Sequence, residues 1–203
     1  MTNDDTDKTL AVYDGMAKKY AQESSERRTN NNLNHFLDQL PVGGHMLDLG
    51  SGSGWASKHA LHRNFRVTAC DGSTGLAAEA EKLTGLKVDI RLYEQIEYSE
   101  NMFDGVWACA SLLHCPKSEF HSLLARVGTS IKPGGQIWAS FKQGDTESCD
   151  KLGRFYAYYQ PDELLEIFQG TGMFENIIIR RIFRDDYLGT PTGFLELSAT
   201  KSP

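Results

Sequence analysis

The stretch MLDLGSGSGWAS, residues Met46–Ser57, decides how this chain folds. Its first half is a short apolar run that predicts a buried strand, and its second half predicts a helix over residues 53–63. Gly50, Gly52 and Gly54 stand between the two at every second position. Glycine accepts positive φ and lets another group lie directly against the backbone, and the N–H groups of a helix start attract anionic or hydrogen-bond-accepting groups. The stretch therefore predicts a strand–loop–helix turn that binds a ligand.

Strands and helices alternate beyond this turn. We expect further strands over residues 66–71, 87–92, 103–110 and 136–142, and helices over 8–22, 33–40, 73–83, 117–131 and 160–172. Helices between strands favour right-handed βαβ units and a parallel sheet. The last two predicted strands, ENIIIRRIF and GFLELSATK, have only a turn between them, which indicates an antiparallel hairpin. The pattern predicts an α/β protein with a doubly wound, mostly parallel sheet of seven strands and an antiparallel C-terminal strand, in an α/β/α sandwich.

The composition narrows the class of protein. The chain has 203 residues and a formal net charge of −6, and no basic patch is visible beyond pairs such as Arg27-Arg28 and Arg180-Arg181, so nucleic acid is a weak candidate partner. No apolar run approaches the roughly 18 residues of a membrane span, and the polar start MTNDDTDK does not resemble a secretory signal. The four cysteines lack C-x-x-C spacing. We expect a cytoplasmic protein with reduced thiols.

A carboxylate at the end of the second strand indicates the kind of ligand. Asp71 lies nineteen residues beyond Gly52, where an acidic side chain can accept hydrogen bonds from both hydroxyls of a ribose. The two features together predict a cofactor that contains a nucleoside. A dinucleotide fingerprint, G-x-G-x-x-G, would need a third glycine where Trp55 stands, so the spacing disfavours a nicotinamide dehydrogenase.

Four segments carry a resemblance to a known family. LDLGSGSG resembles the first motif of class I S-adenosylmethionine (SAM) dependent methyltransferases, and VTACDGS resembles their second. FDGVWACASLLHCP and SIKPGGQIWASF resemble their fourth strand and the loop and strand that follow. The similarity, to small bacterial members of the family, covers residues 10–200. It implies a Rossmann-like fold, SAM as cofactor and one methyltransferase domain over residues 1–203, with an N-terminal helical cap (1–40) and a Rossmann-like core (41–203).

The resemblance also implies a role for each matched residue in binding SAM. The methionine end would be held by Asp48 with Gly50, Ser51, Gly52 and Gly54, and the ribose by Asp71 with Gly72 and Ser73. Tyr93 and Glu94 would flank the adenine, and Ala108 and Cys109 would line the sulfonium side. Tyr13, on the N-terminal helix, would contact SAM from above, and packing is the competing interpretation. Glu94 stands where relatives often have aspartate.

Methyl transfer from a sulfonium is an in-line displacement, and a general base is needed only where the acceptor loses a proton. His114 in SLLHCP is the candidate base, and the alternative is that it packs or caps its loop. Tyr20, Lys142 and Arg154 are candidates for binding an acceptor, with packing or surface charge as the alternative. His59 and His62 have chelating spacing but lack a third ligand nearby, so no metal is expected.

Three functions follow from these observations. The first is a SAM-dependent methyltransferase acting on a small molecule, as a monomer or homodimer without nucleic acid or membrane. The second is a non-catalytic SAM-binding protein, either a sensor or an activating partner. The third is the nicotinamide dehydrogenase that the glycine spacing disfavours.

Overall fold

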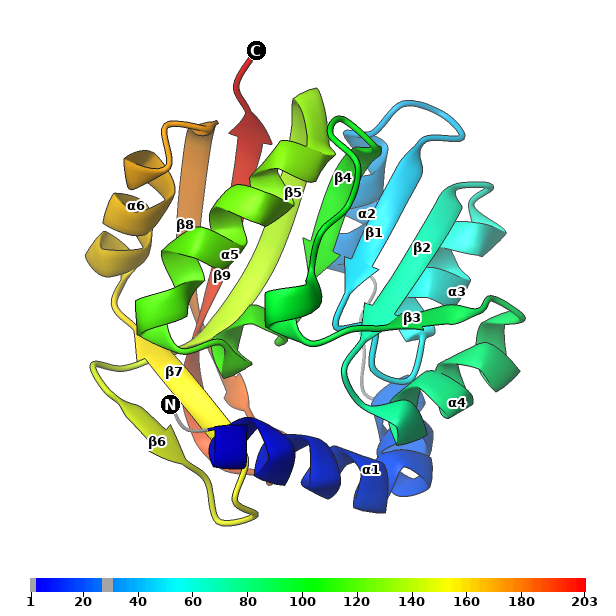
Figure 1. Ribbon diagram of the computed structural model, residues 1–203, viewed down its shortest axis with the longest axis vertical. Helices are drawn as coiled ribbons and strands as arrows, with labels where there is room; N and C mark the ends of the chain where they lie inside the picture. Colours follow the sequence, from blue (N-terminus) through cyan, green and yellow to red (C-terminus); the bar gives the residue numbers. More distant parts are fainter. Residues whose placement is uncertain (1–2, 27–30) are drawn as a thin grey trace.

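The computed structural model describes residues 3–26 and 31–203, and the basic pair Arg27-Arg28 lies outside them. Within these ranges nine strands form one sheet in the order β3-β2-β1-β4-β5-β7-β6, with β9 beside β5 and β8 beside β9 (Figure 1). The strands are β1 His45–Leu49, β2 Arg66–Asp71, β3 Val88–Ile90, β4 Phe103–Ala108, β5 Ile131–Gln143, β6 Glu147–Cys149, β7 Phe155–Tyr159, β8 Phe174–Asp185 and β9 Pro191–Lys201. The helices are α1 Asn3–Glu26, α2 Asn31–Asp38, α3 Trp55–His62, α4 Thr74–Thr84, α5 Lys117–Ser130 and α6 Pro161–Gly170, with 3-10 turns η1 Tyr93–Gln95 and η2 Leu112–His114.

The pairing of the strands confirms the predicted fold class. β1, β2, β3, β4 and β5 pair in parallel, whereas β9 runs antiparallel to β5 and to β8. Strand order reverses between β1 and β4, which makes the sheet doubly wound. The structure adds one hairpin, β6–β7, in a segment that the sequence pattern left as a loop and its exit.

Helices cover both faces of the sheet because the buried strands are apolar on both faces. In Figure 1, α5 and α6 lie on the near face, and α2 and α3 lie behind the sheet. Successive side chains of β1 point to opposite faces of the sheet. Leu47 packs in the larger core with α5 and α6, and Met46 packs in the second core with α2 and α3. Of the helices in the described ranges, none is both long and apolar enough to cross a membrane.

Helix α1 runs across the sheet beyond the C-terminal ends of β1, β2 and β4 (Figure 1). It begins earlier and ends later than the predicted span of residues 8–22. Asp14 of α1 accepts hydrogen bonds from the Ser73 hydroxyl at 2.5 Å and from Gly75 N at 2.8 Å, so it caps the start of α4. Thr9 accepts a 2.9 Å bond from Phe155 N of β7. The helix is therefore fastened at both sides of the space that it covers.

Candidate active site

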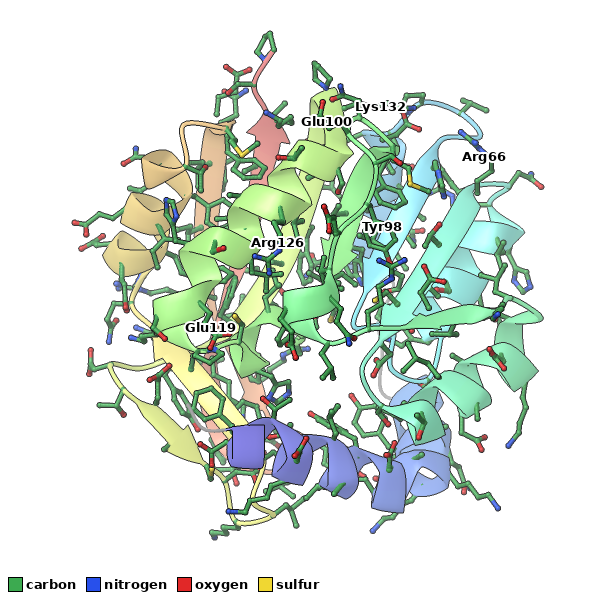
Figure 2. All side chains as sticks on the ribbon, viewed as in Figure 1. Arg66, Tyr98, Glu100, Glu119, Arg126 and Lys132 are labelled. Carbon is green, nitrogen blue, oxygen red and sulfur yellow. The ribbon has the colours of Figure 1, made fainter. Side chains whose placement is uncertain are left out.

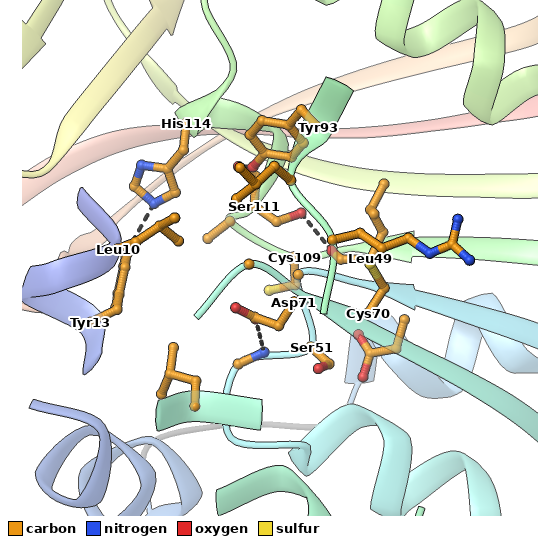
Figure 3. Close-up of a pocket in the computed structure, with 18 of the residues that line it drawn as sticks. Leu10, Tyr13, Leu49, Ser51, Cys70, Asp71, Tyr93, Cys109, Ser111 and His114 are labelled. Atoms are coloured by element: carbon orange, nitrogen blue, oxygen red, sulfur yellow. Dashed lines mark hydrogen bonds between the residues drawn. The ribbon is translucent and has the colours of Figure 1, made fainter. Parts of the chain in front are cut away.

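A pocket opens between α1 and the C-terminal ends of β1, β2 and β4 (Figure 3), where an open α/β sheet binds its ligands. Eleven of the residues predicted for the site line this pocket: Tyr13, Tyr20, Asp48, Gly50, Ser51, Gly52, Asp71, Gly72, Tyr93, Cys109 and His114. Six do not line it: Gly54, Ser73, Glu94, Ala108, Lys142 and Arg154. The sheet therefore brings most of the predicted residues to one place, although they are spread over a hundred positions of the chain.

The glycine loop is bent tightly at the mouth of β1. Gly50 and Gly52 have φ of 73° and 55°, the left-handed region that favours glycine. A Cβ on Gly50 would lie 2.2 Å from the Cβ of Ser111, so the loop has no room for a side chain there. The N–H groups of Gly50 and Ser51 both donate to the carbonyl of Cys70, at 2.8 and 2.9 Å. The loop is thus a fixed surface of bare backbone along the pocket.

Asp71, at the end of β2, holds the same loop. Its carboxylate accepts from Gly52 N at 2.7 Å (Figure 3) and from Ser73 N at 2.8 Å, one bond on each oxygen. Each carboxylate oxygen has a further lone pair with which to accept a ligand hydroxyl. Burial raises the pKa of Asp71, against the lowering effect of these backbone bonds. Asp71 also lines the pocket, and its contact with a ribose stays a prediction.

Asp48 and Gly54 join β1 to α3. One oxygen of the buried Asp48 accepts from both the N–H and the hydroxyl of Ser57, at 3.0 and 2.6 Å, and so fixes the first turn of the helix. Gly54, the residue before α3, has φ of 82°, and a Cβ on it would lie 2.9 Å from the Cβ of Ala80 in α4. Gly54 is therefore required for close packing of the loop on α4, away from the pocket.

Two polar atoms at this end of the pocket lack a partner within the described part of the chain. They are the hydroxyl of Ser51 and the indole N–H of Trp107, whose residues are 4% and 2% exposed and both line the pocket. A buried donor without an acceptor costs free energy that a bound ligand can recover. The sequence did not predict Trp107 as a site residue, because a tryptophan inside an apolar strand is expected to be part of the hydrophobic core.

The opposite end of the pocket is an apolar slot. Leu92, Tyr93 and Ile96, in and around η1, line it together with Leu10 of α1. A Cβ on Gly72 would lie 3.0 Å from Leu10 and 3.4 Å from Leu92, so this glycine keeps the slot open.

The segment around η1 is tied to the near face of the sheet. Arg126 of α5, labelled in Figure 2, donates to the carbonyls of Tyr93 at 2.9 Å and Ile96 at 3.1 Å. Glu94 points elsewhere: it is exposed and does not line the slot. Tyr93, one position earlier in the same 3-10 turn, does line the slot, and the contact of Glu94 with adenine stays a prediction.

His114 lies under α1 with both ring nitrogens bonded. Nδ1 lies against the carbonyl of Phe155, which only accepts, so Nδ1 carries the proton. Nε2 then accepts the hydroxyl proton of Tyr13 at 2.9 Å (Figure 3). Burial lowers the pKa of His114 to about 4, with the positive charges of Arg154 and Lys142 adding to the effect. The imidazole is therefore neutral at physiological pH and reaches the pocket through the Tyr13 hydroxyl.

Of the three residues predicted for acceptor binding, Tyr20 lines the pocket, and Lys142 and Arg154 do not. Tyr20 lines the pocket and packs on Tyr13 at 5.8 Å between ring centres. Arg154 is buried, donates to Asp150 at 2.7 Å and reaches the Tyr13 hydroxyl at 3.4 Å. The arrangement makes Tyr13 the contact between the pocket and a buried guanidinium.

Lys142 is also buried and forms an ion pair with Asp186 in the β8–β9 turn, at 2.9 Å. Both buried cations predicted for acceptor binding, Lys142 and Arg154, are thus balanced by an aspartate, and neither is a surface charge.

Two other predicted residues, Ser73 and Ala108, have structural surroundings, as has His59, which was not predicted for the site. Ser73 caps α4, accepting from Leu76 N at 3.1 Å, and Ala108 is fully buried in the core. His59 is bonded to Asn34 at 2.7 Å. Within residues 3–26 and 31–203 no group of three or more His, Cys, Asp or Glu is placed to hold a metal ion.

Part of the chain, including most of the pocket, is similar to known methyltransferases. Residues 46–135 match the family model described as "Methyltransferase domain". A malonyl-[acyl-carrier protein] O-methyltransferase of Buchnera aphidicola subsp. Baizongia pistaciae is 30% identical over 127 residues, 60% of this chain and 50% of that protein. A dimethylglycine N-methyltransferase of Parasynechococcus marenigrum is 33% identical over 119 residues, 53% of this chain and 41% of that protein. The chain thus spans about half the length of the curated relatives it matches.

A solved structure gives the same result for the fold. The 1,6-didemethyltoxoflavin-N1-methyltransferase of Burkholderia thailandensis, crystallised with 1,6-didemethyltoxoflavin and S-adenosylhomocysteine, has a TM-score of 0.70 at 20% identity, over 95% of this chain and 88% of that one. At this identity the likeness concerns the fold. The match to a methyltransferase domain thus covers residues 46–135, and the likeness in fold extends over 95% of the chain.

Proposed function

We propose that this chain, as a class I SAM-dependent methyltransferase, moves the methyl group of SAM to a small-molecule acceptor, and that residues 1–203 act as one domain. The observation that carries the proposal is the pocket itself. It combines a bare glycine loop, a carboxylate at the end of β2, an apolar slot and a neutral histidine at the carboxyl edge of one sheet. The non-catalytic alternative is not favoured, because the matched proteins are named as methyltransferases.

The residues of the pocket fit the parts of SAM. Asp71 would accept the ribose hydroxyls, and the slot of Leu10, Leu92 and Ile96 would hold the adenine. The amino-acid end would lie on the glycine loop, whose unpartnered Ser51 hydroxyl fits a polar ligand atom. SAM supplies a methyl group on a sulfonium, which is already activated for displacement.

The chain's contribution to the transfer is to align the acceptor, exclude water and receive a proton. Helix α1 covers the pocket and keeps water from the reacting atoms. Where the acceptor carries an O–H or N–H, its proton would pass to the Tyr13 oxygen while the Tyr13 proton moves to Nε2 of His114. Tyr13 would thus contact the acceptor as well as the cofactor, and His114 would act through it.

Tyr20, Lys142 and Arg154 form the proposed acceptor side. Tyr20 would contact the acceptor directly, since it lines the pocket. Arg154 would act through Tyr13, whose hydroxyl it reaches at 3.4 Å, and stabilise negative charge on that oxygen during proton transfer. Lys142, paired with Asp186, would contribute positive charge from behind.

Calorimetry with SAM, S-adenosylhomocysteine and NAD⁺ tests the cofactor assignment. We expect binding of the first two and none of NAD⁺. Asp71→Asn should weaken S-adenosylhomocysteine binding about 10-fold or more, because a hydrogen bond to a charged group is lost, whereas the surface variant Asp38→Asn should not. Failure of the wild-type protein to bind either sulfur compound would overturn the proposal.

A transfer assay with methyl-labelled SAM tests catalysis. Carboxylic acids and amines are the first acceptors to offer, because the matched proteins are named as O- and N-methyltransferases. Labelled product that depends on the enzyme supports transfer. Tight cofactor binding with no transfer to any class of acceptor would favour the sensor or partner function instead.

A further inference from the structure

We propose that the indole N–H of Trp107, together with the Ser51 hydroxyl, binds the α-carboxylate of the cofactor in place of a basic side chain. The inference rests on the proposed function, because it names the group in this chain that recognises one end of SAM. It assigns a binding role to a residue that the fold alone would place in the core.

The first support is the pair of unpartnered donors. Trp107 Nε1 and Ser51 Oγ come from β4 and from the glycine loop, two segments that meet at the same end of the pocket. Both residues are more than nine-tenths buried, so water does not readily satisfy them. One acceptor group with two oxygens would satisfy both donors at once.

The second support is the charge distribution along the pocket. Within residues 3–26 and 31–203, Arg91 is the only lysine or arginine that lines the pocket, and it donates to the carbonyls of Gln95 at 3.3 Å and Glu97 at 2.9 Å, at the adenine end. A carboxylate at the other end would therefore be met by neutral donors and by the start of α3. Gly54 has no side chain to cap that helix start, where Asp48 accepts from the N–H of Ser57, and the N-terminal end of a helix carries partial positive charge.

The third support is the neighbour of Trp107 in the sheet. Asp48 of β1 pairs in register with Trp107 of β4. An amino acid carries one ammonium and one carboxylate on the same carbon, so a carboxylate side chain beside a neutral N–H donor is a matched receptor for the two groups. Asp48 would attract the ammonium and Trp107 would receive the carboxylate.

The Trp107 ring is also held firmly. It stacks on Trp138 with 4.0 Å between ring centres and 11° between planes, and it also lies against Trp55 and Phe36, at 6.3 and 5.5 Å between ring centres. A donor that is fixed before the ligand arrives loses little conformational entropy on binding. This packing gives the N–H a set direction at no further cost to affinity.

The experiment compares Trp107→Phe with Trp138→Phe, which removes the other ring of the same stack and serves as the matched control. Each protein is titrated with S-adenosylhomocysteine and with decarboxylated SAM, which keeps the adenosine, the sulfonium and the amine but lacks the carboxylate. We expect Trp107→Phe to weaken S-adenosylhomocysteine about 10-fold or more, the effect of one hydrogen bond to a charged group, and to leave decarboxylated SAM within about 2-fold. Trp138→Phe should change the two ligands equally.

A measurement on the wild-type protein covers the case in which Trp107→Phe does not fold. The chain has three tryptophans, and ¹⁵N labelling gives each an indole N–H signal in the NMR spectrum. The Trp107 signal should move downfield with S-adenosylhomocysteine and stay near its ligand-free position with decarboxylated SAM. Equal losses for both ligands, or an indole signal that responds equally to both, would overturn the inference and leave the proposed function standing. Absence of any binding by the wild type would overturn both.

Discussion

Gly54→Ala separates the packing role of the third loop glycine from a role in ligand binding. Its φ of 82° costs a residue with a side chain about 1–2 kcal/mol. The new Cβ would lie 2.9 Å from Ala80 Cβ and 3.0 Å from Ala80 Cα, atoms of α4 that cannot swing aside, and such overpacking costs about 1–3 kcal/mol. We expect a loss of about 2–5 kcal/mol, which for a chain of this size lowers Tm by roughly 5–20 °C.

Urea and thermal unfolding followed by circular dichroism measure this loss. Ala80→Gly removes the methyl group at 2.9 Å, so the double variant should recover much of the overpacking cost, while the approach to Ala80 Cα at 3.0 Å and the φ cost remain. The coupling between the two substitutions should be about 1–3 kcal/mol. The reasoning is refuted if Gly54→Ala costs under 1 kcal/mol, if the coupling is near zero, or if the folded variant loses S-adenosylhomocysteine affinity 10-fold.

Three further predictions concern His114, Lys142 and Gly50. Burial lowers the pKa of His114 from 6.5 to about 4, so the unfolded chain takes up a proton at a higher pH than the folded one. The free energy of unfolding should therefore fall by about 3 kcal/mol as pH drops from above 6.5 toward 4. Chemical unfolding across that range should show a shallower pH dependence for His114→Gln than for the wild type. Asp186→Asn leaves Lys142 buried without its counter-charge and should cost about 3–5 kcal/mol at pH 7, most of it recovered by adding Lys142→Met; an unchanged urea midpoint for the single variant would contradict the buried pair. Gly50→Ala places a Cβ 2.2 Å from Ser111 Cβ and should abolish S-adenosylhomocysteine binding by calorimetry even where the protein still folds, whereas Gly134→Ala, also at positive φ but in open space, should bind normally.

The sequence predicted the layers of the fold because its periodicities are local. A few consecutive residues are enough to identify the apolar runs of β1 to β5, the start of α6 at Pro161 and the end of α4 at Gly85. The hairpin β6–β7 did not, because β6 is exposed and polar, and its strand character comes from pairing with β7.

Site residues whose role depends on local backbone conformation could be predicted from the sequence. Those whose role depends on contacts between distant segments could not. Gly50, Gly52 and Asp71 follow from glycine spacing and strand ends. The bond between Tyr13 and His114 joins residues 101 positions apart, and it changes how His114 meets the pocket. Glu94 lies outside the pocket whereas its neighbour Tyr93 lines it, a difference of one position within a 3-10 turn that propensity does not resolve.

The bonds that hold α1 in place affect how fast a ligand can enter or leave the pocket. Asp14, Thr9 and Tyr13 tie this helix to α4, β7 and η2, so a molecule beneath it leaves only when bonds to three separate elements have opened. If the chain acts as proposed, we expect local unfolding of α1 to govern the residence time of a bound molecule and product departure to limit turnover.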